Sequence, residues 1–163
     1  FIMEAWNDFG IQPSLIAAVG SRESNWGQSR LMRPKGPAGT GDRRKRNGTL
    51  PPDGAGWGRG IMQIDYQWHE FARSGPWDEP AANIRYAAKL LADNLAHVDS
   101  KYAHLPPELR FRAAVAAYNA GLGRVSRLLD DGRTDVDAVT SGRDYSEDVI
   151  GRRFFFMDAL GIA

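Results

Sequence analysis

The stretch SLIAAVGSRESNWG, residues 14–27, decides how the rest of the chain is interpreted. Its apolar residues Leu15 and Val19 lie four positions apart and Glu23 follows at the same interval, so a helix would place all three on one face. That face would point to the core, where burial disfavours the charged form of a carboxyl group. The pattern therefore predicts a raised pKa for Glu23 and a role as proton donor.

Periodicity alone leaves a second interpretation of Glu23 open. A helical glutamate beside an apolar stripe often reaches the edge of the stripe and pairs with an arginine, and Arg22 and Arg30 are close in sequence. Perturbed carboxyl groups occur in structural ion pairs as well as in functional sites. Other motifs in the chain must therefore decide between catalysis and a structural ion pair.

Length and composition indicate one ordinary globular domain over residues 1–163. Hydrophobic residues make up 42% of the 163 and charged residues 25%, and the net charge is +1. A chain with so small a net charge has no strong positive electrostatic potential with which to hold nucleic acid. The basic run DRRKR at residues 42–46 lies among Gly, Pro and Asn, which is typical of a solvated loop, with contact to an anionic polymer as the other interpretation. We predict a monomer that does not bind nucleic acid.

Several features are missing from the sequence. There is no cysteine, which excludes disulfides and thiolate metal sites. His69, His97 and His104 are not spaced as the ligands of a zinc helix, so we predict no metal and no cofactor. No apolar run approaches the ~20 residues that a membrane span needs. The opening FIMEAWNDFG has neither the basic start nor the apolar core of a signal peptide, so we expect none in this piece.

The region around GIMQID, residues 60–65, is predicted to flank a cleft. Residues 31–60 are rich in Gly and Pro and are interpreted as a long loop, which in a compact domain is often functional. GIMQID itself is predicted to be a short strand. Because side chains alternate along a strand, Gln63 and Asp65 would then point to the same side.

The remainder of the chain is predicted to be helical. Apolar spacing, prolines at the starts and glycines at the ends predict helices over 13–29, from 78 or 79 to about 98, over 106–120 and over 124–131. A last helix is predicted to begin at Asp144, where Glu147 three positions on would complete a capping box. The predicted fold class is mainly α: a helical bundle around a cleft, with a small β element near 61–66.

Four motifs resemble a known family in content and in order. They are SRESNWG at 21–27, GWGRGIMQID at 56–65, AYNAGLGRV at 117–125 and RDYSEDVIGR at 143–152. Together they resemble the goose-type lysozymes and their bacterial and phage relatives, a subgroup of the lysozyme-like superfamily close to the soluble lytic transglycosylases. Any one motif alone would be a weak signal, whereas four in the family's order cover most of the chain.

The resemblance implies cleavage of the β-1,4 bond between N-acetylmuramic acid and N-acetylglucosamine in peptidoglycan. Glu23 takes the position of the family's general acid. Asp65 matches an aspartate associated with the attacking water, which favours inverting hydrolysis. A second aspartate of this kind has two candidates, because the loop here is longer than usual: Asp53, which we prefer for its spacing from Asp65, and Asp42, which has the more similar neighbours. Either aspartate is otherwise explained as a turn residue.

Six further residues match positions near the family's cleft. The resemblance implies that they contact the substrate: Ser24, Met62, Gln63, Tyr118, Asn119 and Tyr145. Structural explanations stand beside these roles, since Tyr118 suits a core, Asn119 a helix end and Ser24 a cap. Trp26, Trp57 and Trp68 are candidates either for stacking on sugar rings or for core packing.

The resemblance also bounds partners and location. The implied partner is peptidoglycan or a chitooligosaccharide, and the implied location is secreted, periplasmic or phage-associated. Three other functions remain open at this point: a lytic transglycosylase that forms 1,6-anhydro-muramyl products, a chitin-cleaving relative, and an inactive module that only binds glycan.

Overall fold

The computed structural model describes residues 1–28 and 46–161, and it confirms the predicted mainly α fold. In chain order, the α-helices are α1 (Ile2–Phe9), α2 (Pro13–Ser24), α3 (Glu70–Ser74), α4 (Pro80–Lys101), α5 (Pro107–Ala120), α6 (Leu122–Asp130) and α7 (Tyr145–Leu160). Two short 3₁₀ helices, η1 (Val136–Val139) and η2 (Ser141–Arg143), precede α7. Strands β1 (Gly58–Arg59) and β2 (Ile64–Asp65) form an antiparallel pair.

Helix α2 carries Glu23 and lies deep in the molecule. Pro13 occupies its first turn as predicted, and Leu15, Ile16 and Val19 are buried. The helix ends at Ser24, earlier than the sequence indicated, because Asn25 adopts a left-handed conformation with φ 48°. Since α2 packs against α7, the end of α2 lies beside the start of the last helix.

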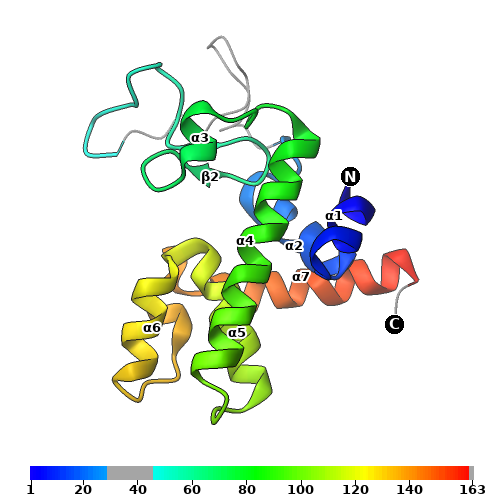
Figure 1. The fold of residues 1–163 in the computed structure, drawn as a ribbon, viewed down its shortest axis with the longest axis vertical. Coiled ribbons are helices and arrows are strands. Elements are labelled where there is room, and N and C mark those ends of the chain that lie inside the picture. The colour runs from blue at the N-terminus through cyan, green and yellow to red at the C-terminus, as the bar shows by residue number, and fades with distance from the viewer. Residues whose placement is uncertain (29–45, 162–163) are drawn as a thin grey trace.

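Helix α4 holds the two ends of the molecule together. It runs along the long axis, from the end that carries α3 and β2 to the end that carries α5 and α6 (Figure 1). One buried cluster joins residues of α1, α2, α4 and α7, and a second joins α4 to α5 and α6. Leu95 packs against both clusters. The alanines of α5 allow close packing against α4.

The predicted strand over 61–66 is shorter than expected. Only Ile64 and Asp65 are extended, and the chain turns between Gly60 and Gln63, where the Gln63 N–H donates to the Gly60 carbonyl over 3.1 Å. Gly60 has φ 67°, and a Cβ there would lie 2.3 Å from the Asn83 amide nitrogen, so only glycine fits. Asn83 on α4 holds this turn: its Oδ1 accepts the Met62 N–H at 2.8 Å and its Nδ2 donates to the Arg59 carbonyl at 3.2 Å.

The predicted capping box at the start of α7 is wrong. Asp144 makes no side-chain cap, because its carboxylate pairs with Arg22 on α2 at 2.7 Å. The cap comes instead from Asp137 in η1. Its carboxylate accepts the backbone N–H groups of Ser146 and Glu147 at 2.8 and 3.2 Å and the Ser146 hydroxyl at 2.6 Å. A buried carboxylate from a neighbouring segment therefore orders the first turn of α7.

Replacing Asp137 by alanine should destabilise the fold by about 3 kcal/mol, because it leaves several buried donors without an acceptor. Burial alone would raise the pKa of Asp137, but hydrogen bonds from Ser146 and Glu147 bring it below its ordinary value. The contribution is therefore present above pH ~4 and is lost as pH falls through the folded-state pKa. Urea unfolding of the unsubstituted chain and of Asp137→Ala, at pH 7 and at low pH, measures this difference in the free energy of unfolding.

The matched control for Asp137 is Asp135→Ala. Asp135 is exposed and pairs with Arg133, also exposed, so its loss should leave the free energy of unfolding nearly unchanged. Equal effects of the two variants would contradict the capping role of Asp137.

Candidate active site

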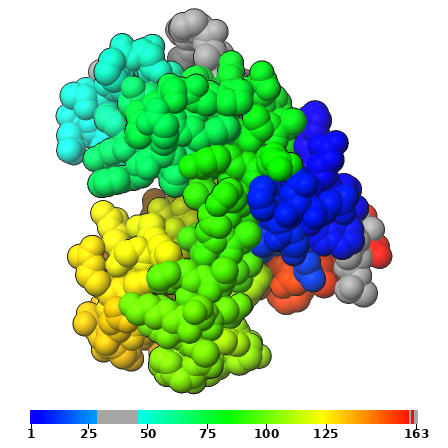
Figure 2. All heavy atoms as spheres, viewed as in Figure 1, coloured from blue at the N-terminus to red at the C-terminus, as the bar shows by residue number. Residues whose placement is uncertain are grey.

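A cavity of about 490 Å³ lies between the β1–β2 side of the molecule and α6. Its walls come from the end of α2, Arg46, the segment 57–69, Leu90 of α4, the C-terminal end of α5, the start of α6 and residues 139–141. In Figure 2 the surface is hollowed between the cyan-to-green segment and the yellow segment that contains α6. Five of the residues predicted from sequence line this cavity: Glu23, Gln63, Asp65, Tyr118 and Asn119.

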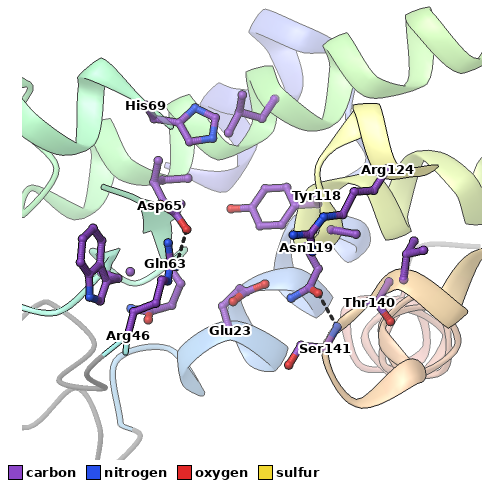
Figure 3. Close-up of a pocket in the computed structure, with 16 residues that line it drawn as sticks. Glu23, Arg46, Gln63, Asp65, His69, Tyr118, Asn119, Arg124, Thr140 and Ser141 are labelled. Carbon is purple, nitrogen blue, oxygen red and sulfur yellow. Dashed lines mark hydrogen bonds and ion pairs between the residues drawn. The ribbon is translucent and has the colours of Figure 1, made fainter. Parts of the chain in front are cut away.

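Glu23 enters the cavity from the last turn of α2 and is half-buried (Figure 3). The buried Tyr145 hydroxyl, on α7, donates a hydrogen bond to its Oε1. Burial, reinforced by the Glu23 carboxyl, raises the pKa of Tyr145 well above its ordinary value, so this hydroxyl keeps its proton. Arg22 points elsewhere and pairs with Asp144 and Asp148 at 2.7 and 3.0 Å. Arg22, one of the two arginines that periodicity left open as partners of Glu23, is thus engaged with Asp144 and Asp148, and Arg30, the other, lies outside the described residues.

Asp65 enters the same cavity from β2 (Figure 3). Its Oδ2 lies 2.7 Å from Nη2 of Arg46, and its Oδ1 accepts the Gln67 N–H at 2.7 Å. The Arg46 guanidinium is itself held, with its Cζ 4.9 Å from the centre of the Trp57 ring and Nη1 donating to the Gln67 amide oxygen at 3.0 Å. The carboxylate of Asp65 is thus fixed in position by a cation and a backbone donor.

Tyr118 and Asn119 at the end of α5 connect separate walls of the cavity. The Tyr118 hydroxyl donates to the Met62 carbonyl at 2.8 Å, and Asn119 Oδ1 accepts the Ser141 N–H at 2.8 Å. Gln63 is fixed by its own turn, with Nε2 donating to the Gly60 carbonyl at 2.9 Å. Hydrogen bonds to the backbone therefore fix each of these three side chains at the cavity.

Three residues expected to contact the substrate do not line the cavity. One is Tyr145, which is buried and donates its hydroxyl hydrogen bond to Glu23. Met62 is completely buried in the core, because the turn at residues 60–63 rotates its side chain inward, which corrects the expectation that it lines the cleft. Ser24 is also buried. Its hydroxyl donates to the Ile61 carbonyl at 2.6 Å and accepts the Gly27 N–H at 2.9 Å, so it ties the end of α2 to the turn.

Asp53, the preferred candidate for the second water-positioning aspartate, is not among the residues lining this cavity. Its carboxylate pairs at 2.8 Å with Arg59, which is completely buried, with its Cζ 4.6 and 4.8 Å from the ring centres of Tyr66 and Trp77. The hydrogen bond from Arg59 lowers the pKa of Asp53. Asp53 thus balances a buried cation. Asp42, the alternative, lies outside the described residues.

Several cavity residues were not identified from the sequence as parts of the site. Besides Arg46 they include His69, Arg124, Thr140 and Ser141. Burial lowers the pKa of His69, and its Nδ1 lies 3.1 Å from the Tyr86 hydroxyl. No periodicity marks these residues, because they come from loops and helix starts. Among the candidate tryptophans, Trp57 lines the cavity, Trp26 packs against the core and Trp68 is exposed.

Within residues 1–28 and 46–161 there is no group of three or more His, Asp or Glu side chains placed to hold a metal ion. No helix in this part of the chain is long and apolar enough to cross a membrane.

Comparison with known proteins identifies the family. The family model described as Lysozyme g matches residues 1–159. Lysozyme g of Gallus gallus is 30% identical over 146 residues, which cover 90% of this chain and 57% of that protein. Lysozyme g of Cyprinus carpio is also 30% identical over 146 residues, covering 90% of this chain and 65% of the relative. The chain thus spans less than two thirds of the length of these relatives. The match over nearly its whole length nevertheless shows that the chain belongs to the Lysozyme g family.

Proposed function

We propose that this chain is a lysozyme that hydrolyses the β-1,4 bond between N-acetylmuramic acid and N-acetylglucosamine in peptidoglycan. The observation that carries the proposal is the presence of two carboxyl groups, Glu23 and Asp65, on different walls of one cavity, each held by its own partner. Membership of the Lysozyme g family and the names of the relatives support it.

Glu23 is proposed as the general acid. A glycosidic oxygen is a poor leaving group until it is protonated, and a half-buried carboxyl group can deliver that proton. The hydrogen bond from Tyr145 to Oε1 fixes the orientation of the carboxyl group. The neighbouring Arg22 is held by Asp144 and Asp148.

Asp65 is proposed as the general base. Its carboxylate, held in place by Arg46 and by the Gln67 N–H, can accept a proton from water. The water oxygen attacks the anomeric carbon as the glycosidic bond breaks, the water proton passes to Asp65, and the Glu23 proton passes to the leaving oxygen. Attack on the face opposite the leaving group inverts the anomeric configuration.

We also infer a single catalytic domain over residues 1–163, since Leu95 of α4 packs against both core clusters. The long loop predicted over 31–60 is part of this proposal. Its described portion, from residue 46, contributes Arg46, Trp57 and Gly58 to the cavity. A monomeric state, a secreted, periplasmic or phage-associated location, and the absence of nucleic-acid binding and of a cofactor stay predictions from the sequence.

Analysis of the products tests hydrolysis against its main rival. Digestion of purified peptidoglycan should yield muramyl reducing ends, formed first as the inverted anomer, because Asp65 supplies a base for water. Mass spectrometry detects the ends and proton NMR of early products detects the anomer. Products lighter by one water, with 1,6-anhydro-muramyl ends, would show that the muramic 6-hydroxyl attacks instead and that the chain is a lytic transglycosylase. Tight binding of glycan without any cleavage would indicate an inactive binding module.

A further inference from the structure

Arg124 places a positive charge at the cavity that neither proposed catalytic step uses. It is the third residue of α6, its side chain is exposed, and it lines the cavity. Figure 3 shows it on the side of the cavity away from Asp65 and Arg46. A substrate lying across the cavity between Glu23 and Asp65 would therefore extend toward this guanidinium.

Within the described part of the chain, the Arg124 side chain has no hydrogen bond, ion pair or ring contact, whereas the other arginine of the cavity is paired. Arg46 is neutralised by Asp65 at 2.7 Å. Two acidic residues near the end of α6 are engaged elsewhere: Asp130 pairs with Lys101 at 2.8 Å, and Asp135 pairs with Arg133 at 2.6 Å. The fold thus leaves the cavity with one guanidinium whose charge no described carboxylate neutralises.

We propose that Arg124 binds a carboxylate of the substrate and so makes the cavity select an acidic glycan over a neutral one. A guanidinium fits a carboxylate through two parallel hydrogen bonds, and this pairing is stronger than a hydrogen bond between neutral groups. The inference rests on the proposed function for the statement that a glycan occupies the cavity. In a muramic-acid glycan the carboxylate belongs either to the lactyl group or to the attached peptide. A polymer of N-acetylglucosamine alone has none.

Binding measurements on a protein that does not cleave its ligand test the proposal. Calorimetry measures the affinity of two proteins, the Glu23→Gln variant and the same variant that also carries Arg124→Gln, for four tetrasaccharides. They are a peptide-free muramic glycan with free lactyl carboxylates, its methyl ester, the same glycan with stem peptides, and chitotetraose. We expect Arg124→Gln to weaken binding of at least one carboxylate-bearing glycan by about fivefold to tenfold. Binding of the ester and of chitotetraose should change by less than about twofold.

Two further variants separate charge from structure. Arg124→Lys keeps the charge and should recover part of the lost affinity. Arg127→Gln is the matched control, because Arg127 lies one turn further along α6, is exposed and donates to the Gly123 carbonyl instead of lining the cavity. It should bind all four ligands as the unsubstituted protein does.

The ligands also identify the source of the carboxylate. A loss with the peptide-free glycan assigns it to the lactyl group, and a loss confined to the peptide-bearing glycan assigns it to the peptide. Equal losses with acidic and neutral glycans, or no loss with any, would overturn the proposal. If acidic glycans bind selectively but the unsubstituted protein, which retains Glu23, cleaves no peptidoglycan, the proposed hydrolysis alone is refuted. If the unsubstituted protein cleaves peptidoglycan but Arg124→Gln does not selectively weaken binding of acidic glycans, the role of Arg124 alone is refuted.

Discussion

Glu23→Gln should lower the rate of peptidoglycan hydrolysis by about a thousandfold or more while leaving the fold intact. Glutamine has nearly the same shape as glutamate, and its amide oxygen can still accept the Tyr145 hydrogen bond. What the variant lacks is the proton that the leaving oxygen needs. Release of reducing ends from purified cell wall, measured at saturating substrate, gives the change in kcat.

The fold of this variant has to be checked independently of its activity. Thermal unfolding followed by circular dichroism should give a melting temperature within a few degrees of the unsubstituted chain, since no described ion pair to Arg22 is lost. Glu108→Gln is a suitable control, because Glu108 is exposed in the first turn of α5 and does not line the cavity. Full lytic activity of the Glu23→Gln chain would end the assignment of Glu23 as the acid.

Asp65→Asn should reduce kcat by about a hundredfold to a thousandfold and change KM little. Asparagine keeps an acceptor for the Gln67 N–H but cannot take a proton from water. It also leaves Arg46 without its anionic partner in the cavity. Because the proposed base acts on water and not on the sugar, the loss should appear in kcat. Initial rates over a range of peptidoglycan-fragment concentrations separate the two constants.

Asp53→Asn is the matched comparison for Asp65→Asn, since both change an aspartate that pairs with an arginine. Because Asp53 does not line the cavity, the Asp53→Asn variant should hydrolyse peptidoglycan at a rate within about threefold of that of the unsubstituted chain. Its melting temperature should fall, because the completely buried Arg59 loses its charged partner. The reverse pattern, in which Asp53→Asn abolishes hydrolysis and Asp65→Asn does not, would assign the base to Asp53.

The helices were predictable because their signals are local. Proline in the first turn and an apolar repeat at three and four positions located α4 and α5, and Gly121 ends α5 as predicted. Leu15 and Val19 of the predicted stripe are buried, although residues 13–20 of α2 are buried on every side of the helix. These features depend on neighbours within one helix, which a sequence displays directly.

The details that failed depend on partners distant in sequence. The turn that buries Met62 is held by Asn83 on α4, and the start of α7 is capped by Asp137 instead of Asp144. Asp53 faces Arg59, whose burial no local pattern indicated. An asparagine on the buried face of α4 was the available signal for the first case, since a buried amide needs hydrogen-bond partners.

The candidate site was predictable in part for the same reason. Glu23, Gln63, Asp65, Tyr118 and Asn119 share one cavity because each belongs to a motif whose local structure presents it. Arg46 and Arg124 show no such motif. Their positions depend on how a loop and a helix start pack against the remainder of the molecule, which periodicity does not report.

The hydrogen bond between Tyr145 and Glu23 joins residues 122 positions apart. It can therefore form only late in synthesis, after both residues have left the ribosome. The ribosome releases α2 long before it makes α7, so a nascent chain that ends before residue 145 has the carboxyl group but not the hydroxyl that orients it. Docking of α7 is then the last step in assembling the acid centre. A protease that removed α7 from the finished protein would return that centre to its incomplete, immature state.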